Sequence, residues 1–155
     1  MVHCNERGSE AIVGDKSHYN LWEQGGLGQI GGIYTRQIQT LDDGTYDLKV
    51  LESMMPDHSD RCCGRVKMVA IENSHNWCGG RILPMDFLEK LGILCRERNI
   101  KIHVDGSRIM TVAAASGIDV KTLVKDCDSV NFCFSRQCGA PVGSILIGDK
   151  EFIQK

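Results

Sequence analysis

The apolar run Lys101–Asp105 ends on residues that could bind a ligand. Its last residue is a carboxylate, and Arg108 follows three positions later, about one helical turn on. In an open α/β sheet, ligands bind where the parallel strands reach their carboxyl ends. Asp105 and Arg108 are therefore candidate ligand-binding residues. The same pattern fits a local role in which Asp105 caps the next helix and Arg108 faces solvent, and the pattern alone leaves both interpretations open.

Three further apolar runs end on polar side chains in the same way. They are residues 11–14, which precede His18; residues 66–71, which precede His75; and residues 129–134, which precede Ser135 and Arg136. Because the carboxyl ends of parallel strands share one edge of a sheet, we expect these side chains to lie near Asp105. For His18 taken alone, a histidine at a helix start or on the surface remains the alternative.

The glycine-rich segment Gly25–Gly32 contains a GxGxxG pattern at Gly26, Gly28 and Gly31. A dinucleotide site of this type needs an apolar strand directly before the glycines and a helix directly after them, so that the helix amino terminus meets the phosphates. Here a strand-like run at 33–38 follows instead. We therefore predict a flexible loop, and a nucleotide-binding domain is the less favoured hypothesis.

Composition excludes several classes of protein. A chain of 155 residues with 42% hydrophobic content can bury one core, which predicts one domain. The net charge of -2 gives no electrostatic reason to bind nucleic acid or an anionic membrane, and no apolar run is long enough to span a bilayer. The eight cysteines contain no CxxC pair, which favours free thiols and a soluble protein of the reducing cytoplasm.

A metal site is not expected. His58, Cys62 and Cys63 are close in sequence, but adjacent cysteines do not match the spacing of tetrahedral zinc ligands.

The remaining pattern alternates helices with strands. We expect helices after Asp47 and Pro84, two short helices at 108–117 and 120–126, and a helix end at Gly8. The strand expected at 144–147 follows its predecessor too closely for a crossover helix, so it should be antiparallel. The prediction is an α/β domain with a mostly parallel sheet, one antiparallel strand and helices on both faces.

Four segments in this order resemble the threonine aldolase family of fold-type I pyridoxal-phosphate enzymes, which includes the aromatic amino acid beta-eliminating lyases. They are HYNLWEQGG at 18–26, ENSHNWCGGRILP at 72–84, HVDGSR at 103–108 and SRQCGAPVGS at 135–144. The resemblance covers nearly the whole chain. It implies a large domain of the aspartate-aminotransferase type and cleavage of threonine or allo-threonine to glycine and acetaldehyde.

The resemblance also implies roles for the residues at the strand ends. Asp105 would pair with the pyridine nitrogen of pyridoxal phosphate, and His18 would stack on its ring and take part in proton transfer. His75 would lie near the β-hydroxyl of the amino-acid substrate, and Arg108 would hold a cofactor oxygen or the substrate carboxylate. Ser135 would also contact the cofactor. Active sites of this family lie at a dimer interface, which implies a homo-oligomer, or a hetero-oligomer with a full-length relative.

One position departs from the family. The Schiff-base lysine is expected directly after Ser135, where this chain has Arg136. An arginine stays protonated and is a poor nucleophile, so it cannot make that covalent link. Lys16 is the one lysine expected near the same edge, whereas Lys101 begins its strand at the opposite edge. We therefore expect impaired catalysis, and we do not expect Lys16 to replace the missing amine.

Compared with the family, residues 1–155 correspond to a partial large domain. The segment that would bind the cofactor phosphate and the small carboxyl-terminal domain are not part of the sequence, which predicts weak cofactor binding. Two hypotheses follow: a threonine-aldolase-like lyase that is catalytically impaired, or a non-catalytic regulatory protein that pairs with a full-length relative.

Overall fold

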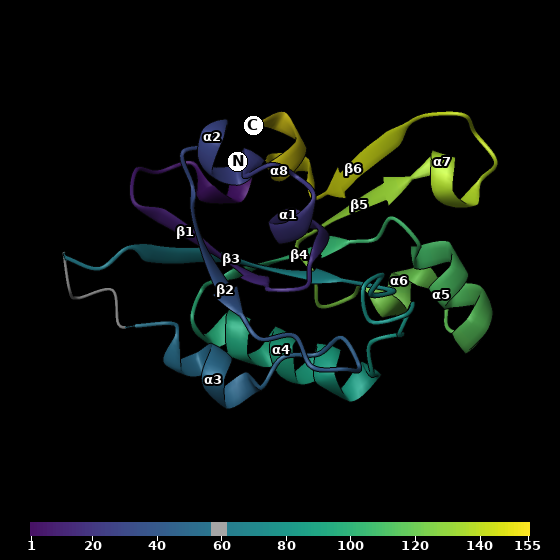
Figure 1. Ribbon diagram of the computed structural model, residues 1–155, viewed down its shortest axis with the longest axis horizontal. Helices are drawn as coiled ribbons and strands as arrows, with labels where there is room; N and C mark the ends of the chain where they lie inside the picture. Colours follow the sequence, from purple (N-terminus) through teal and green to yellow (C-terminus); the bar gives the residue numbers. More distant parts are fainter. Residues whose placement is uncertain (57–61) are drawn as a thin grey trace.

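A single six-stranded sheet organises the chain (Figure 1), and the computed structural model describes residues 1–56 and 62–155. The strand order is β2-β1-β3-β4-β5-β6, with β6 antiparallel to β5 and the other pairs parallel. The strands are β1 (Ser9–Gly14), β2 (Tyr34–Ile38), β3 (Arg65–Glu72), β4 (Lys101–Asp105), β5 (Ser129–Cys133) and β6 (Ser144–Gly148). The predicted mixed sheet is confirmed.

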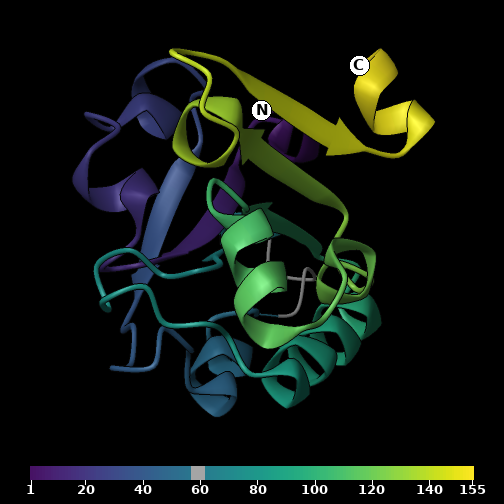
Figure 2. The same ribbon diagram turned by 90° about the vertical axis from the view of Figure 1, so that its right-hand side faces the viewer.

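Helices lie on both faces of this sheet. The longest, α4 (Met85–Glu97), lies beside α3 (Leu48–Ser53) under one face, whereas the short α1 (His18–Leu21), α2 (Gly26–Gln29) and α8 (Lys150–Gln154) lie on the other (Figure 1). The remaining helices are η1 (Val2–Cys4, 3-10), α5 (Ile109–Ser116), α6 (Val120–Leu123) and α7 (Phe134–Gln137). Figure 2 shows α5 and α7 in front of the sheet, at the edge where the parallel strands end.

Local sequence explains where the two lower helices begin. The Asp47 carboxylate accepts a hydrogen bond from the Lys49 amide at 2.8 Å, which caps α3 as expected. Pro84 precedes α4, and the apolar stripe of that helix is buried against the sheet. The main core therefore lies between α3, α4 and the lower face of the sheet, with a smaller cluster on the upper face around Ala11 and Val13.

Three local predictions need correction. The glycine-rich segment is not entirely a loop, because Gly26–Gln29 forms one helical turn stabilised by local backbone hydrogen bonds. The strand expected at 129–134 ends at Cys133, and Phe134 begins α7, which carries Ser135 and Arg136. The amino-terminal residues form a 3-10 turn and then an irregular segment that ends at Gly8, whose φ is +79°.

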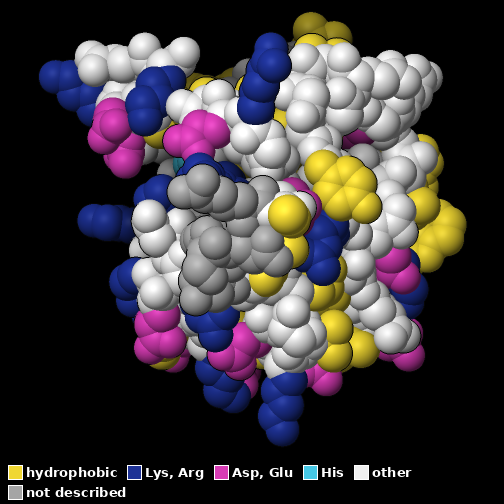
Figure 3. Space-filling view, turned by 90° about the vertical axis from the view of Figure 1, so that its left-hand side faces the viewer, with side chains coloured by type: hydrophobic (Ala, Val, Ile, Leu, Met, Phe, Trp, Pro, Cys, Tyr) yellow, Lys and Arg dark blue, Asp and Glu magenta, His cyan; other side chains and the backbone are white. Residues whose placement is uncertain are grey.

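Charged side chains of both signs alternate over the edge where β1 and β3 begin (Figure 3). Within the parts that the structure describes, no helix is long and apolar enough to cross a membrane.

Gly14, the last residue of β1, lies where a side chain does not fit. A Cβ atom there would overlap the Thr40 hydroxyl and lie 3.0 Å from Tyr46 Oη, which donates a hydrogen bond to the Ala70 carbonyl. We expect Gly14→Ala to reduce the free energy of unfolding by about 1–3 kcal/mol through overpacking. Gly26→Ala is the control, because its Cβ would meet no atom within 4 Å. Urea denaturation measures both, and an equal effect of the two changes would contradict the packing argument.

Candidate active site at the carboxyl edge of the sheet

Two buried carboxylates lie side by side where β3 and β4 end. Glu72 and Asp105 are partners in the register of the two strands and are 5% and 7% exposed. Neither forms an ion pair with another residue in the described ranges. Two adjacent acids in a region of low dielectric favour a cationic or protonated ligand group.

One carboxylate oxygen of Asp105 is hydrogen-bonded, and the other is not. Its Oδ1 accepts hydrogen bonds from the Ser107 amide at 3.0 Å and from Asn131 Nδ2 at 3.2 Å. Of the described residues, none donates to Oδ2. Gly106 allows this approach of the strands, because a Cβ there would lie 2.8 Å from the Asn131 carbonyl oxygen. The fixed carboxylate thus offers one oxygen to a ligand.

Glu72 connects the two segments that carry the candidate histidines. Its Oε2 accepts from the His18 amide at 3.1 Å, and its Oε1 accepts from the Asn76 amide at 2.9 Å. Its role was missed in the sequence, although it ends its strand as Asp105 does. The carboxylate therefore fixes the start of α1 and the loop after β3 relative to each other.

His75 is fully buried, yet neither ring nitrogen has a hydrogen-bond partner in the described structure. Burial lowers the pKa of its imidazole, while the negative charge of Glu72 opposes that shift. The backbone of His75 is fixed, since its amide donates to the Arg81 carbonyl at 2.8 Å. An unpaired neutral imidazole close to two acids can donate or accept a ligand proton.

His18 is half-buried and begins a row of aromatic rings at this edge. Its Nδ1 lies 2.6 Å from Glu23 Oε1, and its ring centroid lies 5.5 Å from that of Trp22. Trp22 lies 5.4 Å from Trp77, and the two indoles are 45% and 57% exposed. Because these are the only two tryptophans of the chain, intrinsic fluorescence reports directly on this edge.

The predicted site residues on α7 and at the start of α5 are more exposed to solvent than Asp105 and His75. Arg108 is half-buried at the start of α5, and its guanidinium has no hydrogen-bond or ion-pair partner in the described structure. Ser135 and Arg136 are exposed on α7, which Gln137 joins to α5 through hydrogen bonds of 2.9 Å to Met110 and Thr111. The structure brings α7 to the correct edge but leaves its side chains open to solvent.

Lys16 lies just beyond β1, at the same edge as His75. Its ammonium contacts Asp42 at 3.6 Å, and its charge contributes to lowering the pKa of His75. Lys101 begins β4 at the opposite edge, where it pairs with Asp128 at 2.7 Å. The positions of these two lysines therefore agree with the sequence interpretation.

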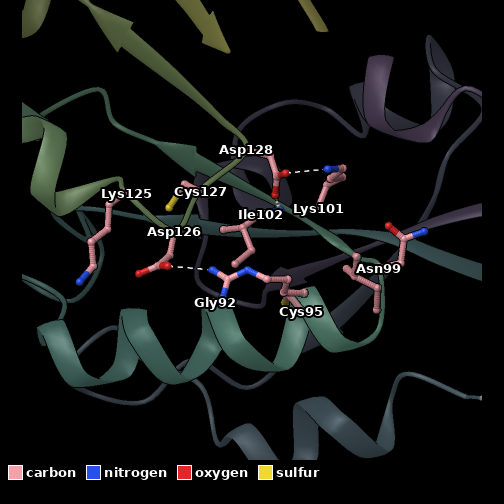
Figure 4. A pocket seen from close by; sticks show the side chains of 11 residues that line it. Gly92, Cys95, Asn99, Lys101, Ile102, Lys125, Asp126, Cys127 and Asp128 are labelled. Atoms are coloured by element: carbon pink, nitrogen blue, oxygen red, sulfur yellow. Dashed lines mark hydrogen bonds and ion pairs between the residues drawn. The ribbon is translucent and has the colours of Figure 1, made fainter. Parts of the chain in front are cut away.

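A cavity of about 230 Å³ opens at the opposite edge, near the starts of β4 and β5 (Figure 4). Its charged side chains pair with one another, since Arg96 contacts Asp126 at 2.9 Å and Lys101 contacts Asp128 at 2.7 Å. This internal pairing leaves little for a charged ligand. Within residues 1–56 and 62–155, no group of His, Cys, Asp and Glu could hold a metal ion, and His58 lies outside the described residues.

The residues at the carboxyl edge fit the non-covalent part of a pyridoxal-phosphate site. Asp105 offers an unpaired oxygen to a protonated pyridine nitrogen, and the unpartnered nitrogens of His75 suit a polar ligand. The covalent part does not fit, since the resemblance implies a lysine at position 136 and this chain has an arginine there.

Comparison with known proteins agrees with these features. The family model for beta-eliminating lyases matches residues 1–155. The chain is 40% identical to the low specificity L-threonine aldolase of Escherichia coli K12 and 39% identical to low-specificity L-threonine aldolase 1 of Arabidopsis thaliana. All of this chain is covered, but it spans only 45% and 44% of those two relatives.

Solved structures show the same fold. The structure of Leishmania major threonine aldolase superposes with a TM-score of 0.83 at 18% identity, over 98% of this chain and 44% of that one. A pyridoxal-phosphate-bound C-S lyase from Staphylococcus hominis superposes with a TM-score of 0.71 at 15% identity, over 99% and 40%. The chain therefore belongs to the beta-eliminating lyase family, the family of pyridoxal-phosphate enzymes that its resemblance to threonine aldolases indicated.

Proposed function

We propose that this chain is a threonine-aldolase-like protein. Its site keeps the residues that contact the cofactor non-covalently, but it lacks the amine that would bind the cofactor covalently. The proposal depends on two features that occur together. One oxygen of the Asp105 carboxylate is available to a ligand, and residue 136 is an arginine. Residues 1–155 are then part of the large domain of a pyridoxal-phosphate-dependent lyase. The reaction to which the ancestral site belonged is the cleavage of threonine or allo-threonine to glycine and acetaldehyde, in threonine catabolism and glycine biosynthesis.

Each residue of the edge has a role in this proposal. Asp105 holds the proton on the pyridine nitrogen, while His18 covers the ring face and Arg108 and Ser135 bind cofactor or substrate oxygens. His75 exchanges a proton with the β-hydroxyl of the substrate, for which its low pKa and unpartnered nitrogens suit it. When bound, pyridoxal phosphate supplies an electron sink for the carbanion that remains after the carbon–carbon bond breaks.

The test is the absorption spectrum of the folded protein after incubation with pyridoxal phosphate and dialysis, followed by borohydride reduction and mapping of any labelled lysine. We expect no stoichiometric label on a lysine. A cofactor fixed to Lys16 would contradict the proposal, because it would show that another amine has replaced the missing one.

Removing the charge of Asp105 tests the non-covalent part. We expect Asp105→Asn to weaken pyridoxal phosphate binding at least about tenfold, because a hydrogen bond to a charged group contributes about 1.5–3 kcal/mol. Asparagine retains an oxygen to accept from Ser107 and Asn131. Quenching of Trp22 and Trp77 fluorescence measures the affinity. Equal affinity of the variant and the parent would exclude Asp105 as the ring partner.

The second candidate function is a non-catalytic cytoplasmic protein that pairs with itself or with a full-length relative. Strand β6 supports it, because Ile145, Leu146 and Ile147 are 46–49% exposed and lie on the last strand of the sheet. Co-purification with a full-length threonine aldolase tests it. A strictly monomeric chain that does not bind such a relative would exclude this function.

A further inference from the structure

Cys133 lies in a polar cluster at the carboxyl edge of the sheet. The proposed function gives it no role. It is the last residue of β5 and is half-buried. Its Sγ lies 3.2 Å from the Ser107 hydroxyl and 3.9 Å from Arg136 Nη1. A hydroxyl and a guanidinium therefore lie within reach of this thiol, and a thiol is a nucleophile.

The neighbouring strand supplies independent evidence that a ligand belongs here. Cys133 follows Asn131 by two residues on the same face of β5, and Asn131 is the register partner of Asp105. Asp105 is 7% exposed and its Oδ2 has no donor in the described structure, while Asn131 Oδ1 is buried without a partner. A buried acceptor is normally paired, so the unpaired Asn131 Oδ1 beside the open Asp105 oxygen indicates a ligand with N–H groups at the ends of β4 and β5.

We propose that Cys133 forms a reversible covalent bond to an aldehyde ligand of the pyridoxal type, in place of the absent lysine amine. The sulfur adds to the carbonyl carbon, so a C–S bond forms and the carbonyl π bond breaks. The thiol proton goes to the carbonyl oxygen, which becomes a hydroxyl. The product is a hemithioacetal, and the reaction needs no oxidant or reductant.

Ser107 and Arg136, which both contact Cys133, would have different roles in this reaction. Ser107 Oγ, at 3.2 Å, can accept the thiol proton and relay it to the new hydroxyl. The Arg136 guanidinium donates a hydrogen bond, which stabilises the negative charge that develops first on sulfur and then on oxygen. An arginine at position 136 thus promotes attack by the thiol although it cannot itself make the covalent bond.

Other cysteines of the described structure are less suited to this reaction. Burial raises the pKa of both Cys95 and Cys127 to about 12, so these two thiols stay protonated. Cys138 is exposed directly after α7, five positions beyond Cys133. It is therefore a matched control for thiol reactivity at this edge.

The test compares pyridoxal 5′-phosphate with pyridoxine 5′-phosphate, which has the same ring and phosphate but an alcohol in place of the aldehyde. Tryptophan fluorescence gives the affinities on the full chain, and loss of the aldehyde absorption band reports addition to the carbonyl. We expect Cys133→Ser to weaken pyridoxal phosphate binding at least tenfold and to leave pyridoxine phosphate binding unchanged. Cys138→Ser should change neither.

A second measurement needs no variant. Pyridoxal phosphate should protect Cys133 from alkylation by iodoacetamide, as mapped by mass spectrometry, and pyridoxine phosphate at the same occupancy should not. Equal affinity of the parent protein for the two ligands, absence of binding by folded protein, or unchanged aldehyde affinity in Cys133→Ser would overturn the inference.

The inference rests on the proposed function, because both place a pyridoxal-type ligand at Asp105. Their failures are distinguishable. Borohydride fixation on a lysine would refute the impaired covalent site, whereas unchanged aldehyde binding in Cys133→Ser, with Asp105→Asn still weakened, would refute only the thiol bond.

Discussion

Replacing Arg136 by lysine should give a protein that borohydride fixes to pyridoxal phosphate at position 136, whereas the parent protein is not fixed on a lysine. A lysine side chain at this place supplies the amine nucleophile that arginine lacks. Residue 136 is exposed on α7 and its contact with Cys133 Sγ lies at the surface, so the substitution should leave the fold intact. Peptide mapping after reduction identifies the labelled residue, and the effect is the gain of a covalent product.

The matched control is Arg96→Lys. It adds the same functional group at the opposite edge, where the Arg96 side chain is 67% exposed and pairs with Asp126. We expect no specific label there. If Arg136→Lys stayed unlabelled while retaining fluorescence quenching by the cofactor, the assignment of position 136 to the lysine site would be wrong.

Lowering the pH should destabilise the protein through two histidines on the upper face of the sheet, the buried His103 and the half-buried His3. The Ser129 hydroxyl lies 2.7 Å from His103 Nδ1 and 2.7 Å from His3 Nε2. Burial lowers the pKa of His103 to about 4, against the opposing charge of Asp105, and burial also lowers the pKa of His3. Both rings are therefore neutral in the folded chain at neutral pH.

The direction of the effect follows from proton linkage. Between pH 6.5 and about 4 the unfolded chain binds a proton at residue 103 that the folded chain does not, so folding becomes less favourable as the pH falls. Above pH 6.5 the protonation of His103 costs the folded chain nothing. Between pH 6.5 and pH 4 it lowers the free energy of unfolding by about 3 kcal/mol. Urea denaturation at a series of pH values measures it.

The control is His103→Gln, which keeps a polar side chain next to Ser129 but does not titrate. The variant should lose much of the pH dependence of the unfolding free energy between pH 6.5 and 4, whatever its stability at neutral pH. An identical slope in parent and variant would show that the dependence arises elsewhere.

Much of the scaffold could be predicted because its signals are local. The run Lys101–Asp105 forms β4 over the predicted residues, and Asp47 and Pro84 start α3 and α4 as expected. The short link before β6 correctly indicated the antiparallel strand. The failures were also local. Helices of one turn, such as α2 and α7, are too short to show a helical spacing of apolar residues. In addition, a run of glycines favours no particular backbone conformation.

The candidate site was predictable only in part. His18, His75, Asp105 and Arg108 stand out by type and by position at strand ends, but a strand end does not reveal its cross-strand partners. Glu72 was passed over because its importance depends on bonds to residues 54 positions before and 4 positions after it. The contact between Cys133 and Ser107 likewise joins residues 26 positions apart.

The sequence by itself determined the family and the alternation of strands and helices, and it predicted that Arg136 stands where the family has a lysine, since these depend on residue types and their spacing. Only the tertiary structure decided that Asp105 keeps one oxygen unpaired, that His75 is buried without a partner, and that Arg136 and Ser107 both contact Cys133. Burial and hydrogen-bond pairing arise from contacts between distant segments, and the register of the parallel strands creates those contacts.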